Sequence, residues 1–488
     1  MLVQDHSVLS GVASTVQNYT YKDDKGCYNR IVIAKVGQLL VDNWSNACLE
    51  PLHKHLLRSR GADSLECFDG FRFETISDGL SSLGEAMEDP VGFCKSIHEN
   101  CVSPLRDLLR KLHHPSDGSR VTCIISDAVM TFTLKIAEEL GIPEVLFCSN
   151  SACGQMAYFH YQELIRRGLV PLKDESYISN GYLDTVIDWI PGMKDMRLRD
   201  LPSFIRTTDP NEHFLNFQRD QAQKAFKASM IIFNTFDDLE LEVLHAMRSM
   251  FPPRIYTIGP LSLQCRLMTD SGLNSIKSSM WKDDADCLKW LDSHEVASVI
   301  YVSFGSTTIS TSQQVTEFAW GIVNSNHPFL WVIRHDLIMG DHTNFPQDLQ
   351  HKIQERGMIV SWCPQEDVLA HPSVRLFLTH CGWNSTLEGI SSGVPMLCWP
   401  FWADQQTNCR YSCIEWGVGM EIDNNAKREE IEVLIREMMG GEKGKEMRKK
   451  VLKWKESAEI ATKEGGSSYT NLELLVQELL QPRESEVM

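Results

Sequence analysis

Short apolar runs alternate with longer helical patterns from about residue 120 onward. In the first half the apolar runs are "VTCIISD" (121–127), "EVLFCS" (144–149), "ASMIIFNTF" (228–236) and "RIYTIGP" (254–260). Helical patterns separate them at 128–141, 152–168 and 237–250. Continuous short runs of this kind are typical of strands buried on both faces of a parallel sheet. Strand–helix alternation therefore predicts right-handed βαβ units, with helices covering the sheet.

A second series of the same kind follows a polar segment, 261–283, that has no sustained periodicity. Its apolar runs lie at 298–306, 328–334, 357–362, 374–380 and 395–400, and helical patterns fill 427–441 and 444–480. We predict an α/β protein with two Rossmann-like domains facing across a cleft, as a chain of 488 residues permits. The predicted divisions are an N-terminal domain (1–260), a linker (261–283), a C-terminal domain (284–465) and a final helix with its tail (466–488).

Charge and hydropathy exclude several kinds of partner. The chain carries 47 basic and 65 acidic residues, a formal net charge of −18. This balance argues against nucleic acid or an anionic membrane as the main partner. No apolar run reaches the ~18 residues of a membrane-spanning helix, and the first residues make a poor secretory signal. We therefore expect a cytoplasmic protein without a transmembrane segment.

The fifteen cysteines are spread singly along the sequence. Cys409 and Cys413 form the closest pair of the later half, and no second pair lies nearby in sequence. A zinc site would call for a repeated C-x-x-C or a matched histidine pair. The spacing favours scattered buried thiols in a reducing compartment and predicts no metal site.

The stretch "VRLFLTHCGWNSTLEG" (374–389) reads as a strand, a loop and the start of a helix. Ligands of doubly wound sheets bind at such points. Asn384 and Ser385 begin the helix, where free N–H groups and the helix dipole attract a diphosphate. His380 can donate to a phosphate oxygen, and Glu388, one turn later, can accept both hydroxyls of a ribose. The alternative is that Asn384 and Ser385 are ordinary helix caps.

Three further strand ends carry candidate side chains. "FGSTT" (304–308) offers Ser306, while "SWCPQEDVLAHP" (361–372) places Trp362 three residues before Gln365. The Trp362 indole can stack on a flat heterocycle, or it can be a core residue. Asp404 and Gln405, in "PFWADQQTNCRY" (400–411), can grip sugar hydroxyls, or they can cap a helix.

Together these residues match one long signature, "WCPQEDVLAHPSVRLFLTHCGWNSTLEGISSGVPMLCWPFWADQ" (362–405). It is similar to the nucleotide-sugar box of plant family 1 UDP-glycosyltransferases, which have the GT-B architecture of two facing Rossmann-like domains. The likeness extends from about residue 51 to the end of the chain, including "GFRFETISDGL" and "GYLDTVIDWIPGM". These phrases resemble the branch that acts on terpenoid and cyanohydrin aglycones.

The resemblance implies an inverting, UDP-glucose-dependent O-glucosyltransferase for a small lipophilic alcohol, such as an iridoid or other terpenoid alcohol or a cyanohydrin. UDP-glucose would be a co-substrate, with no cofactor and no metal, and the chain is expected to be a monomer. The implied donor-binding residues are Trp362, stacked on uracil, with Cys363 beside it; Gln365 and Glu388 at the ribose; Ser306, His380, Asn384 and Ser385 at the diphosphate; and Trp383, Asp404 and Gln405 at the sugar. A terminal Gln in this box usually accompanies glucose.

The resemblance fails at the catalytic base. The family has a histidine shortly after the first strand, in a segment like F-P-x-Q-G-H-x-x-P, oriented by an aspartate for which Asp127 stands here. This chain instead opens "YNRIVIAKVGQLLVDNWSNACLEPLHKHLLRSRG" (28–61). His6, His53 and His55 do not fit the base position, and Asp127 can also be explained as a cap of the next helix.

Three interpretations of the missing base remain: a wrongly assigned first exon of an active enzyme, a UDP-sugar-binding protein without catalysis, or weak residual catalysis. The altered opening predicts that a central parallel strand of the first sheet is missing or replaced. The acceptor pocket is expected in the N-terminal domain, among aromatics near Phe132, Phe147 and Tyr158, although core packing also explains these three residues.

Overall fold

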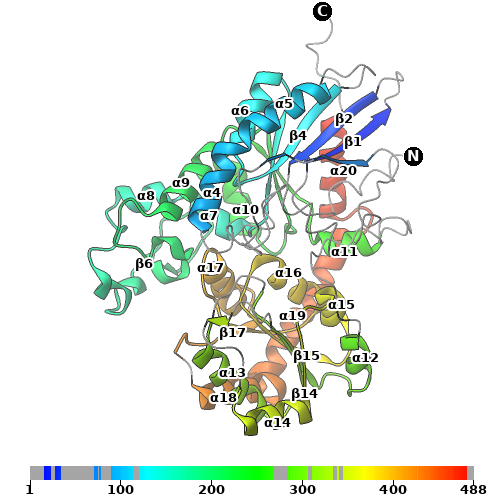
Figure 1. The fold of residues 1–488 in the computed structure, drawn as a ribbon. Helices are drawn as coiled ribbons and strands as arrows, with labels where there is room; N and C mark the ends of the chain where they lie inside the picture. The colour runs from blue at the N-terminus through cyan, green and yellow to red at the C-terminus, as the bar shows by residue number, and fades with distance from the viewer. Residues whose placement is uncertain are drawn as a thin grey trace, which may run out of the picture.

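The computed structural model describes residues 16–22, 28–34, 71–74, 76–77, 90–113, 120–267, 284, 286–305, 310–333, 338–339, 345–425 and 427–480. They form two lobes, each built on a sheet with helices on its faces (Figure 1). His6, His53 and His55 lie outside these ranges, as does Ser306. Within the described part of the chain, no helix combines the length and the apolar character needed to cross a bilayer.

The sheet of the C-terminal lobe is parallel throughout, in the order β14-β12-β10-β15-β16-β17. Read along the chain, this is the doubly wound order 3-2-1-4-5-6. The strands are β10 (Val299–Ser303), β12 (Phe329–Val332), β14 (Gly357–Val360), β15 (Val374–Thr379), β16 (Met396–Cys398) and β17 (Gly419–Glu421). The order reverses between β10 and β15, so the ends of these two strands open the crevice in which such sheets bind ligands.

The helices of this lobe cover both faces of its sheet. They are α12 (Asp286–Asp292), α13 (Ser312–Asn324), α14 (Gln347–Arg356), α15 (Gln365–Ala370), α16 (Trp383–Ser392), α17 (Gln405–Arg410), the π-helical turn η9 (Tyr411–Glu415), α18 (Arg428–Gly440) and α19 (Glu442–Thr462). A short parallel pair, β11 (Ser310–Thr311) and β13 (Ile338–Met339), stands apart from the main sheet. Figure 1 shows α16 and α17 on the side that faces the other lobe.

The sheet of the N-terminal lobe has the order β3-β1-β2-β4-β5-β8-β9. The strands are β1 (Val16–Lys22), β2 (Tyr28–Ala34), β3 (Phe71–Glu74), β4 (Arg120–Asp127), β5 (Glu144–Cys148), β8 (Met230–Phe233) and β9 (Arg254–Thr257). β2 pairs parallel with β4, so the position beside β4 is filled, whereas β1 pairs antiparallel with β2 and β3. Among the described strands of this sheet only β1, from the atypical opening, runs against the others; the edge strand β3 runs in the same direction as β2.

The remaining N-terminal elements surround this sheet. The helices are α4 (Pro90–Asn100), α5 (Val102–His113), α6 (Phe132–Leu140), α7 (Ala152–Phe159), α8 (Tyr161–Arg166), α9 (His213–Ala225), α10 (Leu241–Met250) and α11 (Leu261–Leu267). Between α8 and α9 lie four short 3₁₀ turns, η3 (Glu175–Ile178), η4 (Tyr182–Asp184), η5 (Leu198–Asp200) and η6 (Ser203–Ile205), and the antiparallel pair β6 (Val186–Ile187) and β7 (Met196–Arg197). α11 occupies the first seven residues of the segment interpreted as a linker.

Several predicted helices are shorter than their sequence patterns. The pattern at 152–168 divides at His160, whose ring Nδ1 bonds the carbonyl of Met156 at 2.9 Å. The tail divides where Gly465 adopts a φ of 81°, a conformation that favours glycine. The part beyond this break is α20 (Ser467–Leu480), which crosses to the N-terminal lobe. There Leu472, Leu475 and Leu479 pack with strand residues of β4, β5 and β8 in one buried cluster.

Candidate functional site

The loop from β15 to α16 lies at the centre of the site. α16 begins after Gly382 without any side-chain cap, so the capping interpretation of Asn384 and Ser385 is wrong. The Ser385 hydroxyl instead accepts from Gln365 Nε2 at 2.8 Å. Asn384 Oδ1 accepts from Nδ2 of Asn234, in the other lobe, at 3.4 Å. The N–H groups of the first turn have no intrahelical acceptors and keep their capacity to bind an anion.

His380 is buried at the end of β15, under the backbone of Gly305. A Cβ atom at position 305 would lie only 2.6 Å from His380 Nε2, so the close contact requires glycine there. The φ of Gly305, 74°, also favours glycine. Burial lowers the pKa of His380 to about 4, so the imidazole is neutral at pH 7. No described residue is hydrogen-bonded to its Nδ1. A neutral ring can donate one hydrogen bond, which suffices for a phosphate oxygen.

Gln365 connects the residues assigned to the ribose. Its Nε2 donates to Glu388 Oε2 at 2.6 Å, and its Oε1 accepts from the Tyr301 hydroxyl at 2.9 Å. The three side chains come from α15, α16 and β10, so the network spans the point where the strand order reverses. Trp362 is half-buried just beyond β14 and is not part of the closed core. Cys363 is buried, with its sulfur 3.4 Å from the Tyr301 hydroxyl.

Asp404 and Asn408 form a second group, at the start of α17. Asp404 is buried and makes no side-chain cap, and its Oδ2 accepts from Asn408 Nδ2 at 2.9 Å. The same Nδ2 donates to the carbonyl of Cys381 at 3.0 Å, while Asn408 Oδ1 accepts from the Ser151 hydroxyl at 2.6 Å. One amide therefore joins the β15–α16 loop, the Asp404 carboxylate and the N-terminal lobe. Burial raises the pKa of Asp404 to about 6.

The side chains of Gln405 and Trp383 are hydrogen-bonded to backbone groups of the protein. Gln405 Oε1 accepts from the backbone N–H groups of Phe401 and Trp402, at 2.9 and 3.2 Å. It therefore caps the loop before α17, and its amide nitrogen is the part suited to donate to a sugar. Trp383 is fully buried, and its Nε1 donates to the carbonyl of Asn234 at 2.9 Å. A sugar contact from Trp383 would have to come from its backbone N–H at the start of α16.

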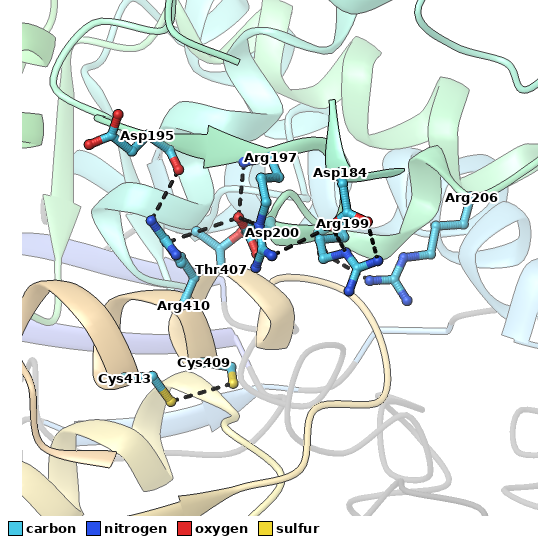
Figure 2. Close-up of polar contacts among 10 residues, drawn as sticks. All are labelled: Asp184, Asp195, Arg197, Arg199, Asp200, Arg206, Thr407, Cys409, Arg410 and Cys413. Atoms are coloured by element: carbon cyan, nitrogen blue, oxygen red, sulfur yellow. Dashed lines mark hydrogen bonds and ion pairs between the residues drawn. The ribbon is translucent and has the colours of Figure 1, made fainter. Parts of the chain in front are cut away.

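A polar seam holds α17 against the N-terminal lobe (Figure 2). Arg197 donates to both carboxylate oxygens of Asp200, at 2.9 and 2.8 Å. From α17, the Thr407 hydroxyl donates to the Asp200 carbonyl at 2.8 Å, and Arg410 donates to the Asp195 carbonyl at 3.0 Å. Backbone and charged contacts thus fix the position of the helix that carries Asn408.

Asp127 lies at the end of β4 and lines a pocket between the two lobes. Its Oδ1 accepts from the Val129 N–H at 3.0 Å. Because α6 begins only at Phe132, Asp127 closes a turn before the helix rather than capping the helix itself. From the C-terminal lobe, Trp402 and Ala403 line the same cavity, so it lies directly beside Asp404.

Most of the cavity wall is apolar or carries amide groups. Its aromatic side chains are Tyr158, Phe204, Phe214, Phe217 and Trp402, and its amides are Asn150, Gln155, Gln218 and Gln221. Only Tyr158 was among the three aromatics expected there. Phe132 stacks edge-on against His98 beside one buried cluster, and Phe147 packs on another, so for these two the core-packing alternative holds.

The structure brings to the site three groups that the sequence analysis did not identify. Asn408 lies one helical turn after Asp404, a spacing that places both on one helix face. Asn234 follows β8 and contacts residues about 150 positions away, which no local pattern reveals. Cysteines remote in sequence converge in space: Cys381, Cys398 and Cys409 have their sulfur atoms within 4.8 Å of one another. The described cysteines are free, as expected, but they are not all isolated.

Comparison with known proteins gives a consistent result. The family model for "UDP-glucoronosyl and UDP-glucosyl transferase" matches residues 69–453. The chain is 53% identical to 7-deoxyloganetin glucosyltransferase of Gardenia jasminoides over 88% of its length and 90% of the relative. It is 51% identical to (R)-mandelonitrile beta-glucosyltransferase of Prunus dulcis, over 88% and 90% of the two chains. The crystal structure of Os79 from O. sativa in complex with UDP superposes with a TM-score of 0.71 at 29% identity, covering 84% and 90%.

Proposed function

The chain belongs to the UDP-glucosyl transferase family, has the GT-B fold, and lies in the branch that contains the 7-deoxyloganetin and mandelonitrile glucosyltransferases. On this basis we propose that the protein transfers glucose, with inversion, from UDP-glucose to the hydroxyl group of a small lipophilic acceptor. Iridoid and other terpenoid alcohols and cyanohydrins are the acceptor classes that the two relatives' names support.

The donor lies along the carboxyl ends of β10, β14, β15 and β16. Trp362 stacks on uracil, while Glu388, held by Gln365 at 2.6 Å, accepts the ribose hydroxyls. The diphosphate binds at the first turn of α16, where neutral His380 donates one hydrogen bond to it. At the sugar end, Asp404 accepts from glucose hydroxyls and the Gln405 amide donates to them.

One observation carries the proposal. The Asn408 amide joins the β15–α16 loop (380–382, the donor loop) to Asp404, and Trp402 and Ala403, just before Asp404, line the pocket that contains Asp127. With Asp404 as the proposed sugar contact, the sugar end of the donor would lie next to the pocket. The pocket has the largely apolar wall, with a few amide groups, that is typical of a small-molecule site. A lipophilic acceptor held there would face its hydroxyl toward the anomeric carbon.

In the proposed reaction the acceptor oxygen attacks the anomeric carbon as the bond to the β-phosphate oxygen breaks. The acceptor loses its proton to a base, and Asp127 orients that base. His380 and the N–H groups of α16 stabilise the charge that develops on the leaving UDP.

The test combines two measurements on the full chain. Titration calorimetry with UDP-glucose, UDP-galactose and UDP should show binding, with UDP-glucose preferred over UDP-galactose. Product analysis with 7-deoxyloganetin, mandelonitrile and other terpenoid alcohols should show a β-glucoside, the product of inversion. Tight donor binding with no product from any acceptor would favour the alternative of a UDP-sugar-binding protein without catalysis. Absence of donor binding would refute both.

A further inference from the structure

Four cysteines of the C-terminal lobe lie close together at the donor loop. Cys381 follows β15, Cys398 ends β16, Cys409 lies in α17 and Cys413 in η9. The sulfur atoms of the first three all lie within 4.8 Å of one another, and those of Cys409 and Cys413 are 4.0 Å apart (Figure 2). Residues 32 positions apart in sequence are thus brought to one point by the strand order of the C-terminal sheet.

The backbone of β17 packs closely against the cluster. A Cβ atom on Gly419 would lie 3.0 Å from the sulfur of Cys398 and 3.7 Å from that of Cys413. Cys381, Cys398 and Cys409 are closed off from solvent, whereas Cys413 is half-buried and gives the cluster a route of access.

η9 brings the fourth sulfur close to the third. Cys413 sits in the middle of this π-helical turn, which continues directly from α17. Such turns are rare and occur frequently at functional sites. Simple hydrophobic packing of thiols explains why each cysteine is buried, but it does not require three sulfurs to lie within 4.8 Å of one another with a fourth 4.0 Å from one of them.

We propose that Cys381, Cys398, Cys409 and Cys413 form a binding site for one thiophilic metal ion of the Zn²⁺ class. In a tetrahedral site with Zn–S bonds of about 2.3 Å the sulfur atoms are about 3.8 Å apart. The observed 4.0 Å and the 4.8 Å limit are within about 1 Å of that geometry. Binding requires that the thiols lose protons and that Cys413, whose sulfur lies outside the group of three but 4.0 Å from that of Cys409, turn toward the other two sulfurs.

The site would act on the donor loop through Cys381. This residue stands between His380 and Gly382 with a φ of 64°, an uncommon conformation for a residue with a side chain. Its N–H donates to the Thr379 hydroxyl at 3.2 Å, and its carbonyl accepts from Asn408. A metal–sulfur bond would fix the side chain as well. The ion therefore has a structural role: it tightens the loop from which the diphosphate site begins.

The test uses chelator-treated, reduced protein kept free of oxygen, with Co²⁺ as a spectroscopic probe. One equivalent per chain should produce the thiolate-to-metal charge-transfer band and the intense visible bands of tetrahedral thiolate coordination, and Zn²⁺ should abolish them. Cys413→Ser, at the accessible edge, should weaken Co²⁺ binding by at least about 100-fold, beyond the 10–100-fold typical of losing a residue that only supports a ligand. Cys101→Ser, a buried cysteine of the N-terminal lobe, is the matched control and should bind Co²⁺ as the wild type does.

Two results would overturn the site. One is wild-type protein that gives no stoichiometric thiolate band, and the other is an undiminished band in a Cys409→Ser/Cys413→Ser double variant. Should that variant fail to fold, alkylation of the wild type followed by mass spectrometry decides the matter. Zn²⁺ should slow alkylation of these four cysteines and no others. Equal labelling with and without Zn²⁺, or a Cys409–Cys413 disulfide in the reduced preparation, would also refute the proposal.

Discussion

The two lobes differ in how far apart in the sequence the residues of their proposed sites lie. In the C-terminal lobe the proposed donor contacts follow the ends of a few successive strands, and the strands are parallel throughout. In the N-terminal lobe the sheet contains a reversed strand, β1, and the pocket wall comes from α4, β4, α7, η6 and α9 together with Trp402 and Ala403 of the other lobe. A site built on successive strand ends is local in sequence, whereas a site built from scattered helices is not.

The difference has a functional meaning. Donor recognition needs a fixed set of groups for a base, a diphosphate and a sugar, and a rigid parallel sheet can hold such a set. Acceptor recognition rests on the shape of an apolar wall, which many side chains can form. Substitutions in the C-terminal lobe should therefore change donor affinity, and substitutions around the cavity should change turnover or acceptor choice.

The largest effect is expected for Asp127→Asn. If Asp127 orients the base, its loss should lower kcat by about 10²–10⁴-fold, the range for a misplaced proton acceptor, while the affinity for UDP stays the same. Steady-state kinetics and calorimetry measure the two quantities. Asp188→Asn, on an exposed position of the same lobe, is the control. A kcat within twofold of the wild type would remove Asp127 from the mechanism.

Glu388→Ala tests the opposite lobe. The loss of charged hydrogen bonds to the ribose should weaken UDP binding by about 1–3 kcal/mol, and the KM for the acceptor should change little. Glu429→Ala, on an exposed position of α18, should bind UDP normally. If calorimetry finds an unchanged Kd for Glu388→Ala, the ribose assignment is wrong.

Gly154→Ala tests the contact between the lobes. A Cβ atom on Gly154 would lie 2.9 Å from Asp404 Cβ and 2.9 Å from the Ser151 hydroxyl, so the lobes would have to separate slightly. The cost should be about 1–2 kcal/mol of unfolding free energy, seen as a lower Tm, with weaker binding of UDP-glucose but not of UDP. Gly440→Ala has no atom within 4 Å of its new Cβ and serves as the control. An unchanged Tm for Gly154→Ala would mean that this contact is not tight in solution.

The same contrast explains what could be predicted from the sequence. Buried strands such as β10 and β8 are continuous apolar runs, so their positions could be predicted from the sequence. The two-lobed fold and the placement of residues from Trp362 to Gln405 after strand ends followed from these positions. Asn234, Asn408 and Ser151 were not, because a partner about 150 or 250 residues away leaves no local pattern. The closeness of the cysteines was hidden for the same reason, because the strand order of the sheet brings Cys381 and Cys398 to Cys409.

The smallest expected effect is a pH dependence at the boundary between the lobes. Burial raises the pKa of Asp404 from its ordinary range to about 6, so above pH 6 the carboxylate is ionised in the folded protein. Because hydrogen bonds to a charged group exceed neutral ones by about 1 kcal/mol, the preference for UDP-glucose over UDP should fall about fivefold as the pH drops through 6.

The stability of the fold should change in the opposite direction. A carboxyl group with a raised pKa binds its proton more tightly in the folded state, so this group's contribution to stability is lost as the pH rises from about 4 to 6. Asp404→Asn should abolish both dependences, with calorimetry following the donors and thermal unfolding following stability. If the ratio of the UDP-glucose and UDP affinities is constant from pH 5 to 8 in the wild type, Asp404 does not hold the sugar, and the link from the donor loop to the cavity through Asn408 is structural only.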